Sequence, residues 1–91
     1  MDQDKEKAMY DNADKFIELA NEMSKTVDQG QVGVAIRYAA ARYSAFEASL
    51  RTENLVEDKD EHLQFLVNTF TEMLQKNFDE YIEILSRRKT S

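Results

Sequence analysis

The sequence predicts an all-α protein, a three-helix bundle with long antiparallel helices. The 91 residues contain no proline and only two glycines, Gly30 and Gly33, so few positions force a helix to end. Apolar residues also recur at steps of three and four over three long segments, which is the spacing of one face of an α-helix. We therefore expect residues 1–91 to form a single helical domain. A core of this size gives modest stability, so burial against a second copy would help.

The first helix is predicted over residues 4–27, followed by a break around the two glycines. Gly30 suits the left-handed position after a helix C-terminus, and Gly33 is acceptable as the N-cap of the next helix. The apolar side of this first helix holds seven residues: Met9, Ala13, Phe16, Leu19, Ala20, Met23 and Val27.

The third helix is predicted over residues 55–86, with 87–91 as a C-terminal tail. Asn54 and Glu57 have the spacing of a capping box, and a second possible start lies at Asp58. At 1.5 Å per residue this helix is about 48 Å long, against about 30 Å for the middle helix, so a straight third helix overhangs its neighbours. Its far end then bends, or is covered by the first helix or by another subunit. The apolar stripe comprises Leu63, Leu66, Val67, Phe70, Met73, Leu74, Phe78, Tyr81, Ile82 and Leu85.

The middle helix, predicted over residues 33–52, has two apolar lines. The first is expected to face an ordinary core: Val32, Ala35, Ile36, Ala39, Tyr43, Phe46 and Leu50. The second advances at heptad steps and consists mostly of small residues: Val34, Tyr38, Ala41, Ala45 and Ala48. We call this second line the small-residue seam. It meets either a helix of the same chain or a second copy, and the short chain with its overhanging third helix favours a homodimer.

Composition excludes several classes of function. The net charge of −6 repels phosphate backbones and anionic lipid, so we expect neither nucleic-acid nor membrane binding. The chain has no cysteine, which excludes disulfides and thiolate chemistry. The sequence shows neither a signal peptide nor an apolar run long enough to cross a bilayer, and a cytoplasmic location is expected.

No pattern of residues indicates a catalytic, cofactor or metal site. His62 is the single histidine, and Lys59 stands where a Glu-x-x-His metal pair needs its carboxylate. Four polar or aromatic residues near the apolar stripes remain as candidates for the lining of a pocket: Arg42, Tyr43, His62 and Asn77. Phe65 lies off the stripe of its helix, either as an isolated exposed aromatic or as part of an interface patch.

Three segments resemble a bacterial family, domain of unknown function 3144. They are DKFIELAN (residues 14–21), YAAARY (38–43) and NFDEYIE (77–83), which lie in the same order and together span nearly the whole chain. The middle segment is the most specific, although it continues here as Ser44-Ala45-Phe46 where many members have an asparagine and a tryptophan. The resemblance implies a bacterial, cytoplasmic, helical protein, and it brings no activity, cofactor or assigned site.

These observations favour a non-enzymatic protein–protein interaction or assembly module. It would act by presenting helix faces, with the small-residue seam for self-association and an acidic, partly aromatic surface for another protein. The alternative is a small-ligand binding domain with a polar pocket between helices.

Overall fold

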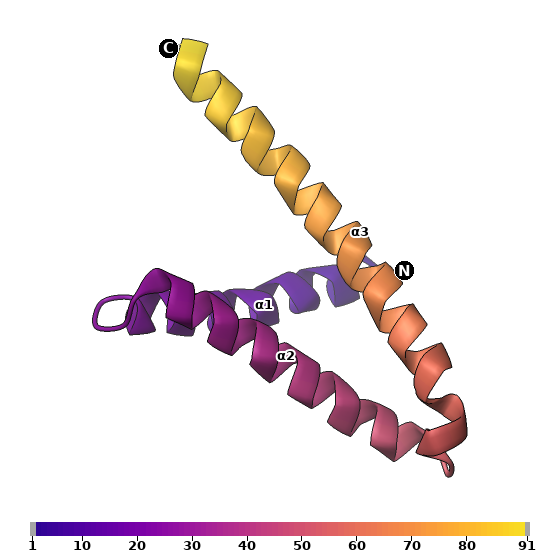
Figure 1. The fold of residues 1–91 in the computed structure, drawn as a ribbon. Helices are drawn as coiled ribbons and strands as arrows, with labels where there is room; N and C mark the ends of the chain where they lie inside the picture. The colour runs from indigo at the N-terminus through magenta and orange to yellow at the C-terminus, as the bar shows by residue number, and fades with distance from the viewer. Residues whose placement is uncertain (1, 91) are drawn as a thin grey trace. The chain divides into compact units, whose positions relative to one another are not determined.

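The structure, a computed structural model, describes residues 2–90 and contains three α-helices (Figure 1). They are α1 (Gln3–Met23), α2 (Gln29–Arg51) and α3 (Leu55–Thr90), and there is no strand within residues 2–90. The predicted all-α class is confirmed. Closure of the three helices into a bundle, and its dimerisation, stay predictions.

Contacts along the chain define two units, residues 1–43 and residues 44–91. The first unit holds α1 and the N-terminal part of α2, and the second holds the last two turns of α2 with α3. Each unit contains one buried apolar residue. Val32 is 6% exposed in the first unit and Ala48 is 7% exposed in the second, and no other apolar residue in the described part of the chain is buried. Each unit therefore has very little core of its own.

α1 ends at Met23, earlier than the predicted residue 27. Its N-terminus is capped by Asp2, whose carboxylate accepts a hydrogen bond from the Asp4 N–H at 2.9 Å. At the other end, the Ser24 hydroxyl and the Ser24 N–H both donate to the Ala20 carbonyl. The chain then tightens into a turn in which the Lys25 and Thr26 N–H groups donate to carbonyls three residues back. Serine and β-branched residues are weak helix formers, which accounts for the early end.

α2 begins at Gln29, and the roles predicted for the two glycines are wrong. Neither glycine has a positive φ, and both lie inside the helix. The N-cap is Asp28, whose Oδ2 accepts a hydrogen bond from the Gly30 N–H at 3.0 Å. Gln31 occupies the N3 position of this helix. Val27 and Val32 have the N′ and N4 spacing that is typical of a hydrophobic staple, which fits the burial of Val32.

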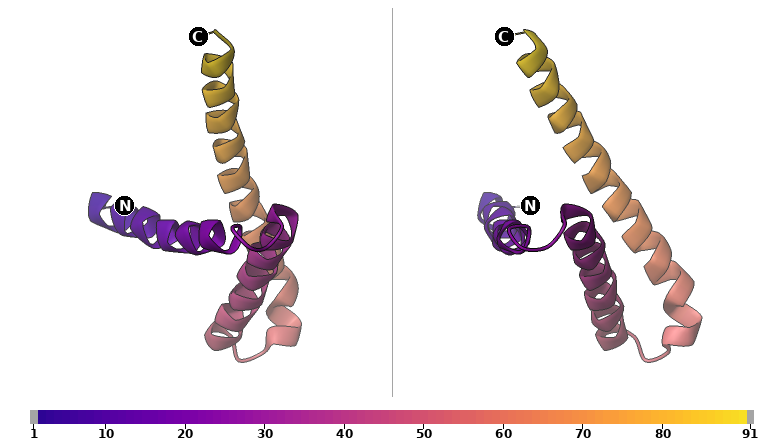
Figure 2. Two further views of the ribbon diagram at one scale, coloured as in Figure 1. Left: turned by 90° about the vertical axis from the view of Figure 1, so that its left-hand side faces the viewer. Right: turned by 60° about the vertical axis from the view of Figure 1, so that its left-hand side comes forward.

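A three-residue loop, residues 52–54, joins α2 to α3 (Figure 2). Asn54 is the N-cap of α3: its Oδ1 accepts from the Glu57 N–H at 3.3 Å, and its carbonyl accepts from the Asp58 N–H at 3.1 Å. The first of the two predicted starts for this helix is therefore confirmed. Thr52 fixes the loop from the other side, because its hydroxyl donates to Asp58 Oδ2 and accepts from the Asn54 N–H.

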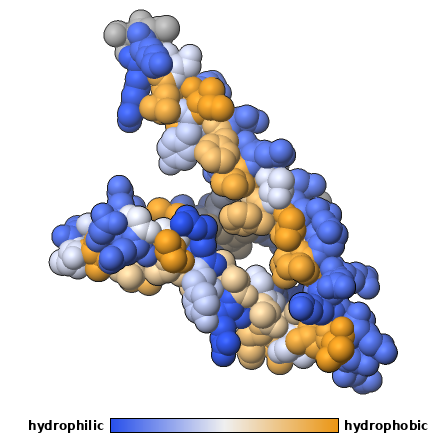
Figure 3. All heavy atoms as spheres, viewed as in Figure 1, coloured by the Kyte–Doolittle hydropathy of each residue, from blue (hydrophilic) through white to orange (hydrophobic). Residues whose placement is uncertain are grey.

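α3 continues to Thr90, so the predicted tail is helical through residue 90. Its 36 residues correspond to about 54 Å at 1.5 Å per residue. Orange and blue side chains separate onto different sides of this helix in Figure 3, as the predicted stripe requires. Nearly the whole stripe is exposed, and so is the line of α2 that was expected to face a core, in which only Val32 is buried. Too little chain belongs to either unit to cover these faces.

Candidate functional site

A cleft of about 380 Å³ lies beside the α2–α3 loop, entirely within the second unit. α2 contributes residues at steps of three and four, and α3 contributes a matching set from its first turns. Such spacing brings one face of each helix to the cleft. The lining residues are Ser44, Glu47, Ala48, Arg51, Asp58, Glu61, His62, Phe65 and Leu66.

The cleft is acidic. Of its three carboxylates, Asp58 accepts a hydrogen bond from Thr52, and Glu47 pairs with Arg51 at 3.2 Å. Glu61 is the third, so negative charge exceeds positive charge around the opening. Phe65, 65% exposed, adds an aromatic edge. Carboxylates next to an exposed ring attract a cationic group better than an anionic one.

These groups do not form a metal centre. Within residues 2–90, no three histidine, aspartate or glutamate side chains are grouped so that they could hold a metal ion. His62 is half-buried at the cleft between helix faces that also carry Ala48 and Leu66.

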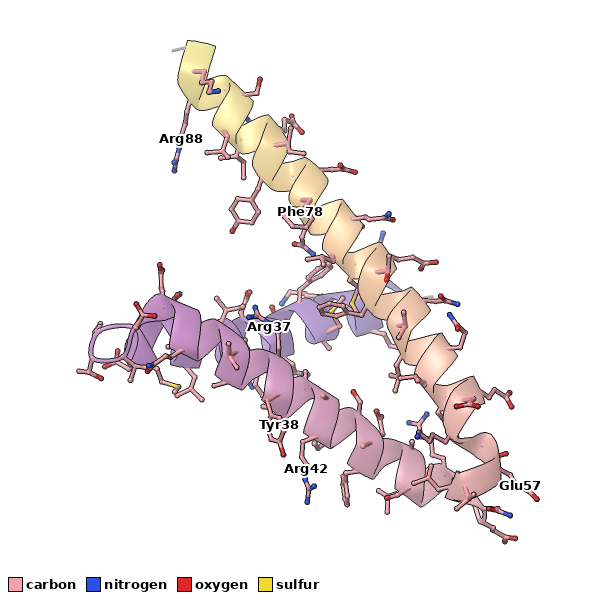
Figure 4. The ribbon with its side chains drawn as sticks, viewed as in Figure 1. Arg37, Tyr38, Arg42, Glu57, Phe78 and Arg88 are labelled. Carbon is pink, nitrogen blue, oxygen red and sulfur yellow. The ribbon has the colours of Figure 1, made fainter. Side chains whose placement is uncertain are left out.

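Of the four residues proposed as a pocket lining, only His62 lines the cleft. Arg42 and Tyr43 are exposed on α2, where Arg42 projects from the helix near Tyr38 in Figure 4. Asn77 is also exposed, and its amide donates to the Met73 carbonyl at 2.8 Å. His62 and Asn77 lie fifteen positions apart on one helix, about 22 Å at 1.5 Å per residue, so they cannot line one small pocket.

The small-residue seam is divided by the fold. Ala48 is buried in the second unit and lines the cleft, so a side chain of the same chain already covers it. Val34, Tyr38, Ala41 and Ala45 are exposed, with Tyr38 at 67%. Self-association through the four exposed members stays a prediction.

A family model described as "Protein of unknown function (DUF3144)" matches residues 9–82. The chain belongs to this family. The match includes parts of all three helices and every residue of the cleft. No curated protein and no solved structure matches the chain. The resemblance drawn from the three sequence segments is thereby confirmed.

The sequence of this DUF3144 protein contains a pattern that indicates the cleft. Ser44, Glu47 and Arg51 have helical spacing before the loop, and Asp58, Glu61 and Phe65 have it after the loop. Pairing the two helices as an antiparallel hairpin about Glu53 places the two sets opposite each other. The missing information was the exact length of the loop, which decides the register.

No helix in the described part of this DUF3144 chain combines the length and the apolar character needed to cross a bilayer. The long α3 in particular carries charged residues throughout its length, including acidic residues in its first turn and basic residues in its last.

Proposed function

We propose that this DUF3144 protein is a non-enzymatic interaction or assembly module of the bacterial cytoplasm that forms a homodimer. One observation supports this most directly: the stripe of α3 from Phe70 to Leu85 is exposed. Only eight residues of α2 share a unit with α3, too few to cover a helix of 36 residues. Contiguous exposed apolar surface marks sites of protein–protein contact.

The module acts by presenting helix faces. The four exposed residues of the small-residue seam let a second helix approach the α2 backbone closely, because Ala41 and Ala45 add only methyl groups. The acidic cleft with Phe65 offers a separate surface for another protein. Neither surface needs a bound cofactor.

Light scattering coupled to size-exclusion chromatography tests this function. We expect the wild-type chain to be a dimer at tens of micromolar and Ala41→Glu to be mostly monomeric. Ala40→Glu is the matched control, since Ala40 is an exposed neighbour outside the seam. A monomeric wild-type protein at that concentration contradicts self-association.

The cleft favours a second candidate, a small-ligand binding domain. Its excess of carboxylates and the exposed ring of Phe65 suit a small organic cation. A panel of such cations in a thermal-shift assay tests it. A compound that stabilises the wild type and not Glu61→Gln supports ligand binding, and an unresponsive wild type rejects this candidate.

A further inference from the structure

We propose that the partner of α3 is the α3 of a second copy, running antiparallel. The last turn of each α3 then lies at the acidic first turns of the other, beside its cleft. This inference rests on the proposed self-association and adds to the contact at α2 a second one, between the two α3 helices, with its direction and its register.

α3 carries a line of eight residues at heptad spacing, which we call the heptad seam, and five of the eight belong to its apolar stripe. From Leu63 the steps alternate between four and three residues over seven steps without interruption, the pattern by which two helices pack along their length. The amide of Asn77 already donates to the Met73 carbonyl, so part of its polarity is satisfied within the helix. The seam consists of Leu63, Val67, Phe70, Leu74, Asn77, Tyr81, Ile84 and Arg88.

This seam is open to a partner. Leu74, near its centre, is 43% exposed and Tyr81 is 62% exposed. α3 is also 13 residues longer than α2, which corresponds to about 20 Å of helix. Only eight residues of α2 belong to the unit that holds α3, so they leave the far end of that helix uncovered. A second α3 covers that end without any change in the chain's own helices.

Charge fixes the direction of pairing. The first turns of α3 carry Glu57, Asp58, Asp60 and Glu61 with a single lysine between them, and its last turn carries Arg87, Arg88 and Lys89. An antiparallel partner brings these opposite charges together, and it also opposes the two helix dipoles. A parallel partner would place acid beside acid at one end and base beside base at the other.

The heptad seam fixes the register. In antiparallel coiled packing, alternate seam positions of the two helices face each other. With Phe70 opposite Leu74 of the second copy, Leu63 lies opposite Tyr81, and the first turn of α3, which holds Glu57, lies level with the last turn of the partner's α3. Arg87 is paired with Glu83 of its own helix at 3.7 Å, and both side chains are exposed, so its guanidinium can reach a second carboxylate. A strip about 54 Å long and about 10 Å wide contributes on the order of 500 Å² per copy, near the lower limit of specific interfaces.

Charge reversal at the two ends of α3 tests the direction. We compare dimer dissociation constants, by analytical ultracentrifugation in low salt, for Glu57→Lys/Glu61→Lys, for Arg87→Glu/Arg88→Glu and for the chain with all four changes. Each double variant is expected to dimerise about tenfold more weakly, and an equimolar mixture of the two is expected to form heterodimers. The four-fold variant is expected to regain most of the wild-type affinity, because reversed acids again meet reversed bases. A four-fold variant weaker than both double variants overturns the inference, provided that circular dichroism shows equal helix content.

Cross-linking tests the register in a chain that has no cysteine of its own. Leu63→Cys mixed with Tyr81→Cys is expected to give disulfide-linked heterodimers under mild oxidation, while neither variant alone cross-links efficiently. Homodimers of Leu63→Cys alone would show a parallel pair and overturn the inference. A monomeric wild type rejects the proposed self-association itself, whereas a dimer that fails both tests rejects only the pairing of α3.

Discussion

Asp28 starts α2 by accepting the Gly30 N–H, one of the four donors that a helix N-terminus leaves without an internal partner. Asp28→Ala removes this acceptor and is expected to lower the free energy of unfolding by about 1 kcal/mol. Asp28→Asn retains a side-chain oxygen and should cost only a few tenths of that value. Urea unfolding followed by circular dichroism measures both, and equal losses in the two variants would contradict the capping role.

Thr52 holds the α2–α3 loop with one hydroxyl that both donates and accepts. Thr52→Val keeps the shape of the side chain but leaves the half-buried Asp58 without this donor and the Asn54 N–H without its acceptor. We expect a loss of about 1–2 kcal/mol in the free energy of unfolding. Thr52→Ser, which keeps the hydroxyl, is the control. The hydroxyl is unimportant if the serine variant loses as much stability as the valine variant.

At the scale of the helix, α2 contains two glycines in ordinary helical backbone, a position where glycine is less favourable than alanine. A Cβ at Gly33 would lie 3.3 Å from Arg37 Nη1, the end of a flexible side chain. Gly33→Ala should therefore raise the free energy of unfolding by about 0.5–1 kcal/mol, a rise of several degrees in melting temperature.

Gly30→Ala is the matched comparison, because a Cβ there would lie 3.0 Å from Asp28 Oδ2, the capping oxygen. It should gain clearly less than Gly33→Ala, or lose stability. Thermal melts of the two variants at one concentration decide the point, and an equal gain at both positions would mean that the cap tolerates the methyl group.

The helices themselves were predictable, and their ends were predictable only in part. Asn54 and Glu57 located the start of α3, although Asp58 offered a second start four residues later. Around Asp28 the two glycines predicted a later start for α2, whereas Asp28, Gln31 and Val32 have the N-cap, N3 and N4 spacing of a helix that begins at Gln29. The hydrogen bond from the Gly30 N–H to Asp28 places Gly30 in the first turn of α2, where its φ is negative.

At the scale of the whole molecule, stability is expected to depend on protein concentration. A folded dimer is favoured by mass action over the unfolded chain, so the melting temperature should rise by several degrees between about 1 and 100 µM. Scanning calorimetry across that range measures the shift. A constant melting temperature would indicate that the folded chain is monomeric throughout.

The candidate site was predicted less completely than the fold. His62 was named because it is a polar residue next to an apolar stripe, and it does line the cleft. Arg42 and Asn77 were named for the same reason, but proximity to a stripe says nothing about which turn of a neighbouring helix lies opposite. The 52–54 loop sets which turns of α2 and α3 lie opposite each other. The same loop therefore determines that Ala48 is buried and Ala45 is not.

The division between the two units falls inside α2, between Tyr43 and Ser44. There is thus no linker at which the chain can be cut into two independent pieces: any cut at that boundary severs a continuous helix. Limited trypsin digestion should accordingly cleave first after Lys25, in the α1–α2 turn, and after Arg51, beside the 52–54 loop, while Arg42 is spared. Early cleavage at Arg42 would show that the middle of α2 opens. A gene fragment for either half should include all of residues 29–51, since each unit needs the same helix.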